Sequence, residues 1–261
     1  MAYASQVGFN ASSSAWTYRE EGGRAIWIAK VANGQTPIVI AQCSAEGSPS
    51  SLRPSELASL GEVSEARRTK FSIGRQCARV CLSHLVEGDV PLVKTSLGDV
   101  DWPQGIVGSV AHSTTTVLCA AAQTSDFLSV GIDTEESSER AVCAAAFVSV
   151  GDEFARFKRR TCGTAIDTAT AFFVAKEATL KAVSSLLRQG IEYSDITIRV
   201  EEPSAGTRSI VDFTGWTSSH ASVALCHGLV TRTGASITAL AVIHGDRGPD
   251  DTDFAPPQSS P

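Results

Sequence analysis

The sequence lacks the features of a membrane-spanning or secreted protein. Although 43% of its 261 residues are hydrophobic, no apolar run approaches the roughly 20 residues that a membrane span requires. Residues 1–10 contain no basic segment followed by an apolar one, which is the pattern of a secretory leader. We therefore expect a protein that does not contact membranes and works in the cytoplasm.

The sequence also lacks a cysteine pattern for disulfides or zinc. Its seven cysteines are an odd number, show no CxxC spacing and form no zinc-binding pattern with histidine. Four of them lie in apolar runs, where cysteine behaves as a small core residue. A reducing compartment agrees with this usage.

Basic residues are too few for general nucleic-acid binding. The chain has 22 lysines and arginines against 28 aspartates and glutamates, for a net charge of −6, and a pI near 5.4. Proteins that bind DNA or RNA through the phosphate backbone need a basic surface. An anionic ligand would therefore have to be held by a local cluster of basic side chains.

Apolar periodicity predicts an α+β fold with two similar halves. Long helices are expected at 64–86 and 167–188 and shorter ones from residue 54, at 138–147 and at 151–158. Strands are expected at 24–31, 37–41, 91–94, 106–111, 115–122, 127–132, 195–200, 208–213, 220–228 and 235–244. Each half would hold one long helix followed by about three strands, with helices and meanders segregated. We assign residues 1–131 and 132–244 to the halves and the acidic, proline-rich residues 245–261 to a disordered tail.

The second long helix carries a carboxylate on its expected inner face. Phe173, Leu180 and Leu187 recur every seven residues and are expected to face inward, and Glu177 falls in the same stripe. A buried carboxylate is costly unless a cation or another partner stabilises it. The alternative is that Glu177 and Lys181 form an ordinary pair at the helix edge, four residues apart.

Two further carboxylates follow the strand-like run at 127–132. Asp133 and Glu135 are two residues apart, so their side chains share one face of a strand. Three carboxylates that converge beside a lysine suit a hard divalent cation handling a phosphate ester. The alternative is a strand that simply runs out into an acidic loop, and these residues alone leave both readings open.

Arginines on the first long helix allow two readings as well. Arg68, Arg75 and Arg79 share one face, with Arg67 beside it. They form either a solvated charged face or a row that binds phosphate, because guanidinium groups match phosphate oxygens. His112 stands where an apolar strand stops, which fits either a structural histidine or the edge of a site.

These segments together resemble the signature of the 4′-phosphopantetheinyl transferases. The family pattern G-[IV]-D-x-E reads GIDTE at 131–135, and [FW]-x-x-K-E-A-x-x-K-A reads FVAKEATLKA at 173–182. Upstream, the segments 67–79 and 102–112 resemble the subgroup that activates enterobactin synthase and similar synthases. Four motifs occur in the family's order between Arg67 and Ala182.

The resemblance implies a large monomeric enzyme whose two α+β halves are related by a pseudo-twofold axis. Coenzyme A would lie in the cleft between them. The implied reaction transfers the 4′-phosphopantetheine arm of coenzyme A to a serine of an acidic apo carrier protein and releases adenosine 3′,5′-bisphosphate. The carriers would be acyl, peptidyl or aryl carrier domains of fatty-acid, polyketide or nonribosomal peptide synthases.

The resemblance also implies roles for individual residues. Asp133, Glu135 and Glu177 would hold Mg²⁺, and Glu177 would be the general base for the carrier serine. The catalytic set would be Glu177, Lys181 and Asp133, with Lys181 contacting the transferred phosphate. The implied coenzyme A contacts are Arg67, Arg75, Lys94, His112, Asp133, Lys176 and Lys181.

One position departs from the family. Ala111 stands where a serine or threonine often adds a hydroxyl contact, and the loss of one neutral hydrogen bond, worth about 0.5–1.5 kcal/mol, predicts slightly weaker coenzyme A binding. An acidic enzyme would also need a basic dock for an acidic carrier. Arg156, Lys158, Arg159 and Arg160 are the candidates, against the alternative of a solvated helix end.

Two functions from other classes remain open. One is a coenzyme A-binding module that has lost catalysis, although such a module would not need the intact acidic residues. The other is a metal-dependent hydrolase of nucleotides, which would act without any carrier protein.

Overall fold

The structure is a computed structural model of the chain. It describes residues 15–21, 24–30, 37–46, 51–96, 98–161, 163–188, 190–200, 210–217, 225–233 and 235–245. Except for Gly245, the predicted tail lies outside these residues. The predicted α+β class is confirmed, because helices and antiparallel sheets occupy separate layers.

The described strands form two five-stranded antiparallel sheets. The N-terminal sheet has the order β1-β2-β3-β5-β4 and contains β1 (Ala15–Glu21), β2 (Arg24–Lys30), β3 (Ile38–Ser44), β4 (Ile106–His112) and β5 (Thr116–Gln123). The C-terminal sheet has the order β6-β10-β9-β8-β7 and contains β6 (Phe127–Glu136), β7 (Ile196–Val200), β8 (Ile210–Thr217), β9 (Leu225–Thr233) and β10 (Ser236–His244). β1 was not predicted, and the predicted strand at 91–94 is only an isolated bridge between Lys94 and Val100.

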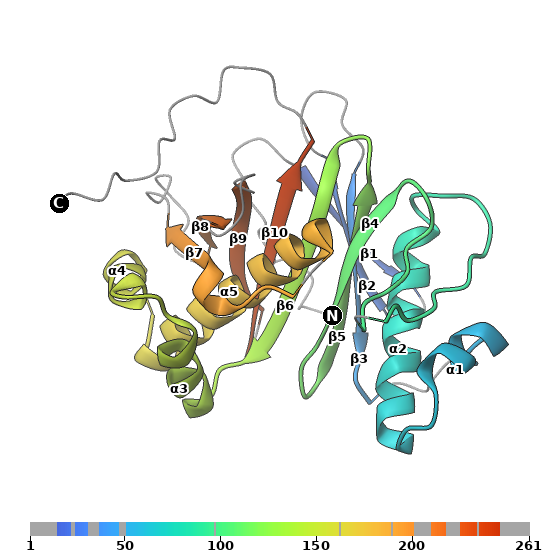
Figure 1. Cartoon of the computed structure of the whole chain (residues 1–261), viewed down its shortest axis with the longest axis horizontal. Coiled ribbons are helices and arrows are strands. Elements are labelled where there is room, and N and C mark those ends of the chain that lie inside the picture. The colour runs from blue at the N-terminus through green and yellow to red at the C-terminus, as the bar shows by residue number, and fades with distance from the viewer. Residues whose placement is uncertain are drawn as a thin grey trace.

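Each sheet is covered by one long helix (Figure 1). The N-terminal half has α1 (Pro54–Leu60) and α2 (Glu65–Leu82), and the C-terminal half has α3 (Glu139–Val148), α4 (Glu153–Arg160), α5 (Ala165–Leu187) and the short 3₁₀ turn η1 (Tyr193–Asp195). Helix α2 packs on β3 and β5, and α5 packs on β6 and β10. Because the strand orders of the two sheets differ, the pseudo-twofold relation stays a prediction.

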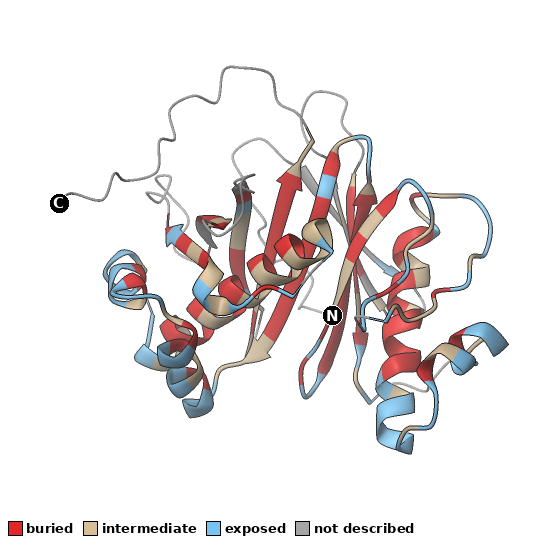
Figure 2. Cartoon of the chain, viewed as in Figure 1, coloured by how far each residue is buried: buried red, intermediate tan, exposed pale blue. Residues whose placement is uncertain are grey.

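The two sheets face each other through a shared apolar core. Alternate residues of β5 point to opposite faces: Val117, Cys119 and Ala121 belong to the core beneath α2, and Leu118, Ala120 and Ala122 to the core between the sheets. Both faces of β5 are therefore buried, which explains its unbroken apolar sequence. Buried residues accordingly fill the central strands in Figure 2, while α1, α3 and α4 expose much of their surface.

The predicted boundary between the halves does not coincide with a break between secondary-structure elements. The predicted boundary after Gly131 falls inside β6, which pairs with β10 from Phe127 to Glu136. The chain crosses from one sheet to the other at the turn 124–126. No helix among the described residues is long and apolar enough to cross a membrane.

The inward face of α5 differs from the predicted one. Phe173, Leu180 and Leu187 are only partly buried, whereas the fully buried positions include Phe172 and a row of alanines. The prediction was wrong because it followed the large apolar residues. Small residues mark the inward face instead, since they let the helix lie close to the sheet.

Gly131 in β6 is the point of closest approach to α5. A Cβ atom at Gly131 would lie 2.0 Å from the carbonyl oxygen of Ala178 and 2.7 Å from the amide nitrogen of Ala182. Nearby, the Ser129 hydroxyl donates a hydrogen bond of 2.7 Å to the Ala182 carbonyl. Only glycine at 131 allows two backbones to approach so closely.

We predict that Gly131→Ala destabilises the fold, because α5 must move away from β6. Overpacking of this kind costs about 1–3 kcal/mol, measurable as a lower free energy of unfolding in urea. Gly190→Ala is the matched control, since a Cβ there would meet nothing within 4 Å. Equal stability of the two variants would contradict the tight contact.

Candidate active site

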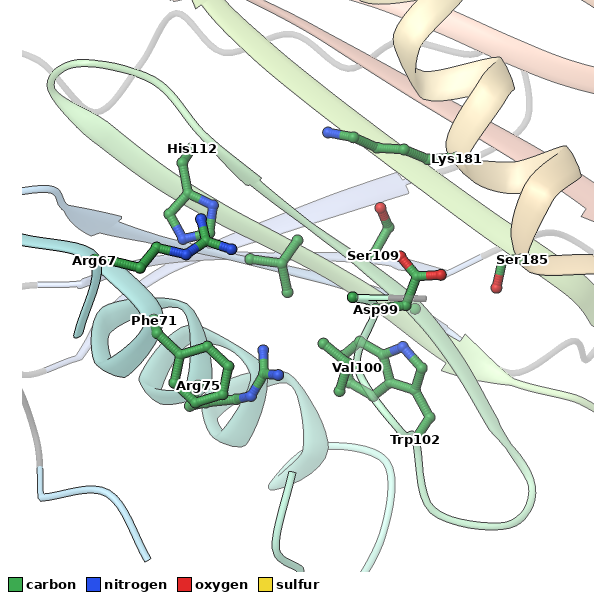
Figure 3. Close-up of a pocket in the computed structure, with 13 residues that line it drawn as sticks. Arg67, Phe71, Arg75, Asp99, Val100, Trp102, Ser109, His112, Lys181 and Ser185 are labelled. Atoms are coloured by element: carbon green, nitrogen blue, oxygen red, sulfur yellow. The ribbon is translucent and has the colours of Figure 1, made fainter. Parts of the chain in front are cut away.

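A cavity of about 210 Å³ lies between the N-terminal half and α5 (Figure 3). Its described lining comprises Arg67, Phe71 and Arg75 of α2, Gly98, Asp99, Val100 and Trp102 of the following loop, Gly108, Ser109, Val110 and His112 of β4, and Lys181 and Ser185 of α5. Four basic side chains thus border one space that both halves enclose.

Arg75 is buried and held in place within this wall. Its guanidinium carbon lies 3.9 Å from the centre of the Phe71 ring, and its Nε donates a 2.6 Å hydrogen bond to the Leu92 carbonyl. Burial lowers the pKa of Arg75 to about 10, against the raising effect of Glu56. The side chain is therefore still a cation at neutral pH, and its remaining N–H groups can bind an anion.

The other predicted arginines separate into different roles. Arg67 is exposed and lines the cavity, which makes it available to a ligand. Arg79 instead forms an ion pair with the fully buried Glu56, which also accepts the Leu92 backbone N–H at 2.9 Å. Arg68 is exposed and does not line the cavity. The predicted arginine row is thus partly structural.

His112 ends β4 and packs against α2 at a glycine. A Cβ at Gly74 would lie 3.0 Å from the His112 Nε2, and Nε2 lies 3.1 Å from the Lys70 carbonyl oxygen. A carbonyl only accepts hydrogen bonds, so Nε2 carries the proton. Burial lowers the His112 pKa, the Lys70 carbonyl opposes this, and the charges of Lys181 and Arg67 lower it further.

Asp133 and Lys181 form the central ion pair of the site. Lys181 Nζ lies 2.6 Å from Asp133 Oδ1 and 3.1 Å from the Ile132 carbonyl oxygen. The second oxygen, Oδ2, is buried and has no hydrogen-bond partner among the residues that the structure describes. Burial raises the pKa of Asp133 to about 6, although Lys181 opposes this, and the charge of Glu177 adds to the rise.

Glu135 and Glu177 stand near this pair. Burial and the charges of Asp133 and Glu136 raise the pKa of Glu135 to about 7. Glu177 accepts a hydrogen bond from the Tyr193 hydroxyl and contributes to the raised pKa values of both Asp133 and Glu135. The three carboxylates therefore repel one another across one region.

The donor set suits Mg²⁺ in its chemistry. No three His, Cys, Asp or Glu side chains within the described part of the chain lie within reach of one metal ion. Lys181 and Tyr193 contact oxygens of Asp133 and Glu177. Mg²⁺ nevertheless prefers carboxylate oxygens, and a cation would relieve both the repulsion and the unpartnered Oδ2 of Asp133. These residues therefore match the ion in the chemistry of their donor atoms but not in their present arrangement.

Glu136 ties the two halves together beside His112. It accepts hydrogen bonds from the Ser113 hydroxyl at 2.7 Å, the Thr115 hydroxyl at 2.6 Å and the Thr114 amide at 3.2 Å. Burial raises its pKa, but these donors outweigh burial and bring the value to about 2. The carboxylate therefore stays ionised and holds the β4–β5 turn against β6.

Several sequence-predicted positions do not line the cavity, and these include Asp133, Glu135 and Glu177. The buried Lys176 has its Nζ 3.1 Å from Glu153 Oε2 and 2.5 Å from the Ile196 carbonyl, so the prediction that it contacts coenzyme A does not fit its position. Ala111 faces the core between the sheets, opposite His112. Lys94 begins the loop that forms one wall, but its side chain is not among the lining residues.

Sequence reasoning missed several lining residues. Phe71, Ser109 and Trp102 lay within the quoted motifs but carried no assigned role, and Asp99 and Ser185 lay outside them. Tyr193 had no signal at all, because its contact with Glu177 spans a helix end and a turn.

Comparison with known proteins identifies the family. The model of the 4′-phosphopantetheinyl transferase N-terminal domain matches residues 56–122, and that of the 4′-phosphopantetheinyl transferase superfamily matches residues 129–239. The chain is 34% identical over 154 residues to the 4′-phosphopantetheinyl transferase Npt of Nocardia iowensis, covering 58% of this chain and 68% of that protein. It is 30% identical over 187 residues to the 4′-phosphopantetheinyl transferase PptT of Mycobacterium tuberculosis, covering 72% of this chain and 78% of that protein.

The chain belongs to the 4′-phosphopantetheinyl transferase superfamily. It is therefore an enzyme, and the reaction of its class is the transfer of phosphopantetheine to carrier proteins. The predicted family is confirmed.

We predict that Lys176→Met destabilises the protein by about 3–5 kcal/mol, because it leaves Glu153 charged and unpaired in the core. Adding Glu153→Gln should recover part of the loss, since the amide oxygen can still accept the Ile198 N–H that Glu153 now accepts at 2.5 Å. Denaturant unfolding measures both. Lys158→Met, at an exposed position of α4, is the control and should change stability by less than about 0.5 kcal/mol. If Lys176→Met alone were as stable as Lys158→Met, the result would contradict a stabilising buried ion pair.

Proposed function

We propose that the enzyme binds coenzyme A in the cavity and transfers its 4′-phosphopantetheine arm, with Mg²⁺, to the serine of an apo carrier protein. The observation that carries this proposal is the placement of Lys181. Its ammonium group lines the cavity with Arg67, Arg75 and His112, and it also contacts Asp133 at the carboxylate cluster. One residue therefore joins an anion-binding space to an acidic centre.

The basic side chains of the cavity bind the phosphate groups of coenzyme A in this proposal. Arg75 is already oriented by Phe71 and Leu92, so little side-chain freedom is lost when it binds an anion. Arg67 and His112 face the same space, and an added phosphate would favour protonation of the imidazole. We also propose Lys94 as a nucleotide contact, because it pairs with Val100 in the loop that forms one wall of the cavity.

The carboxylates supply the metal site and the base. Asp133, Glu135 and Glu177 would hold Mg²⁺, which when bound neutralises charge on the pyrophosphate and the leaving nucleotide. Glu177 removes the proton from the carrier serine. Lys181 offsets the charge that develops on the transferred phosphate. Adenosine 3′,5′-bisphosphate is the leaving group. Because both halves belong to one chain, the proposed site needs no second subunit.

We predict that the wild type, given coenzyme A, Mg²⁺ and an apo carrier protein, increases the carrier's mass by one phosphopantetheine arm. Glu177→Gln should abolish the mass gain while the dissociation constant of coenzyme A, measured by calorimetry, stays within about threefold, because the base is lost and the basic wall is intact. Lys181→Ala is the comparison variant and should lower kcat more than it weakens coenzyme A binding.

The outcomes separate the other functional classes. Release of adenosine 3′,5′-bisphosphate without any carrier would favour a nucleotide hydrolase. Coenzyme A binding with neither product would favour a binding module. Substantial turnover by Glu177→Gln would remove Glu177 as the base.

The end of α4 is the proposed carrier dock. Lys158, Arg159 and Arg160 are exposed in its last turn, whereas Arg156 pairs with Asp152 at 2.8 Å. The preceding helix exposes Phe147, a residue that is 83% accessible. Basic and apolar groups on successive helices suit an acidic protein partner.

We predict that Arg159→Glu/Arg160→Glu raises the KM for the carrier by about tenfold, since like charges would then meet at the contact. Steady-state kinetics with each substrate varied in turn provides the measurement. The internal control is the KM for coenzyme A, which should not change because these residues do not line the cavity. An unchanged carrier KM would exclude this surface.

A further inference from the structure

Tyr193 contacts Glu177 although the two lie on different elements. Tyr193 opens the η1 turn after α5, and its hydroxyl donates a hydrogen bond to Glu177 Oε1. The ring is partly buried and packs edge-on against Phe147, with the ring centres 6.5 Å apart and the planes at 75°. The phenol is therefore held at its hydroxyl, and its ring has an aromatic neighbour.

The backbone of the same tyrosine is held from the core. Lys176 Nζ lies 3.2 Å from the Tyr193 carbonyl oxygen and 2.5 Å from that of Ile196, at the two ends of the turn. Glu153 neutralises this ammonium group at 3.1 Å, and both side chains are buried to at least 99%. The ion pair thus anchors η1 to α5.

Lys176 and Glu177 are adjacent in α5, and both contact Tyr193, one at its backbone carbonyl and the other at its hydroxyl. Successive helix positions point about 100° apart, so Lys176 enters the core while Glu177 stays partly exposed beside Asp133. Lys176 holds the carbonyl of Tyr193, and the hydroxyl of Tyr193 holds Glu177. The position of Glu177 is therefore linked to the buried pair through a single side chain.

We propose that Tyr193 is a positioning residue for the carrier-serine reaction. Its hydroxyl binds one oxygen of Glu177 and restricts the carboxylate to one orientation, and the Lys176–Glu153 pair holds the turn that carries it. The other oxygen of Glu177 remains for the metal or the serine proton. A carboxylate repelled by Asp133 would otherwise occupy several rotamers, and reactions are slowed when a reacting group is loosely held.

This inference rests on the proposed function, since it takes Glu177 as the base. Tyr193→Phe removes only the hydroxyl, and we expect kcat to fall about tenfold while the KM for coenzyme A stays within about twofold. Ser194→Ala is the matched control, because it removes an exposed hydroxyl from the same turn. It should leave both constants unchanged.

A second measurement tests the contact without activity. Tyr193→Phe should lower Tm by about 2–4 °C in the wild type, and by much less in a Glu177→Ala background, where the hydroxyl has no carboxylate to bind. Such non-additivity indicates a direct interaction. Additive Tm shifts would overturn the contact, and so would a Tyr193→Phe enzyme with a kcat within twofold of wild type.

The two proposals fail in different ways. If Glu177→Gln still transfers the arm, the assignment of the base fails. If Glu177→Gln is inactive and Tyr193→Phe equals the wild type, only the positioning role fails. If Tyr193→Phe lowered kcat and raised the KM for coenzyme A by the same factor, the positioning role would also be overturned, because the change would indicate a disturbed cavity.

Discussion

The close contact between α5 and β6 is the constraint on which the site depends. Gly131 leaves room for the backbone of α5 at Ala178 and Ala182, and without it the helix would have to lie further from the sheet. At this separation Lys181 Nζ reaches Asp133 Oδ1 at 2.6 Å. Gly131 therefore serves the acidic residues beside it in the GIDTE segment. The close helix–strand contact that requires glycine at this position also brings Lys181 to Asp133.

Assembly of the two halves completes the cavity. The core between the sheets joins β5 and β4 to β6, and Glu136 holds the turn that follows His112 through three hydroxyl and amide donors. His112, Arg67 and Arg75 thereby face Lys181 across one space. Three of the four basic lining side chains come from the N-terminal half, whereas Lys181 and the three carboxylates of the proposed metal site come from the C-terminal half.

Sequence patterns predicted the α+β class and most strands, and they selected Asp133, Glu135, Glu177 and Lys181 because charged residues at regular spacing stand out in apolar elements. They failed where side-chain size or long-range contacts decide. Phe173 and Leu180 suggested the wrong inner face for α5, since the alanines that permit close packing look unremarkable in a sequence. The structure also moved Lys176 from the predicted ligand set into a buried ion pair, where Glu153 and two carbonyls use its donors.

The sequence by itself determined the local chemistry: an acidic pair on one face of a strand, a glutamate and a lysine one helical turn apart, and arginines on an earlier helix. Spacing along a chain decides which side chains share a face, so these features are readable without a fold. Only the tertiary structure decided which arginines line the cavity, that Lys181 belongs to both the cavity and the acidic centre, and that Tyr193 holds Glu177. These contacts join elements far apart in sequence, and packing between the elements sets their distances.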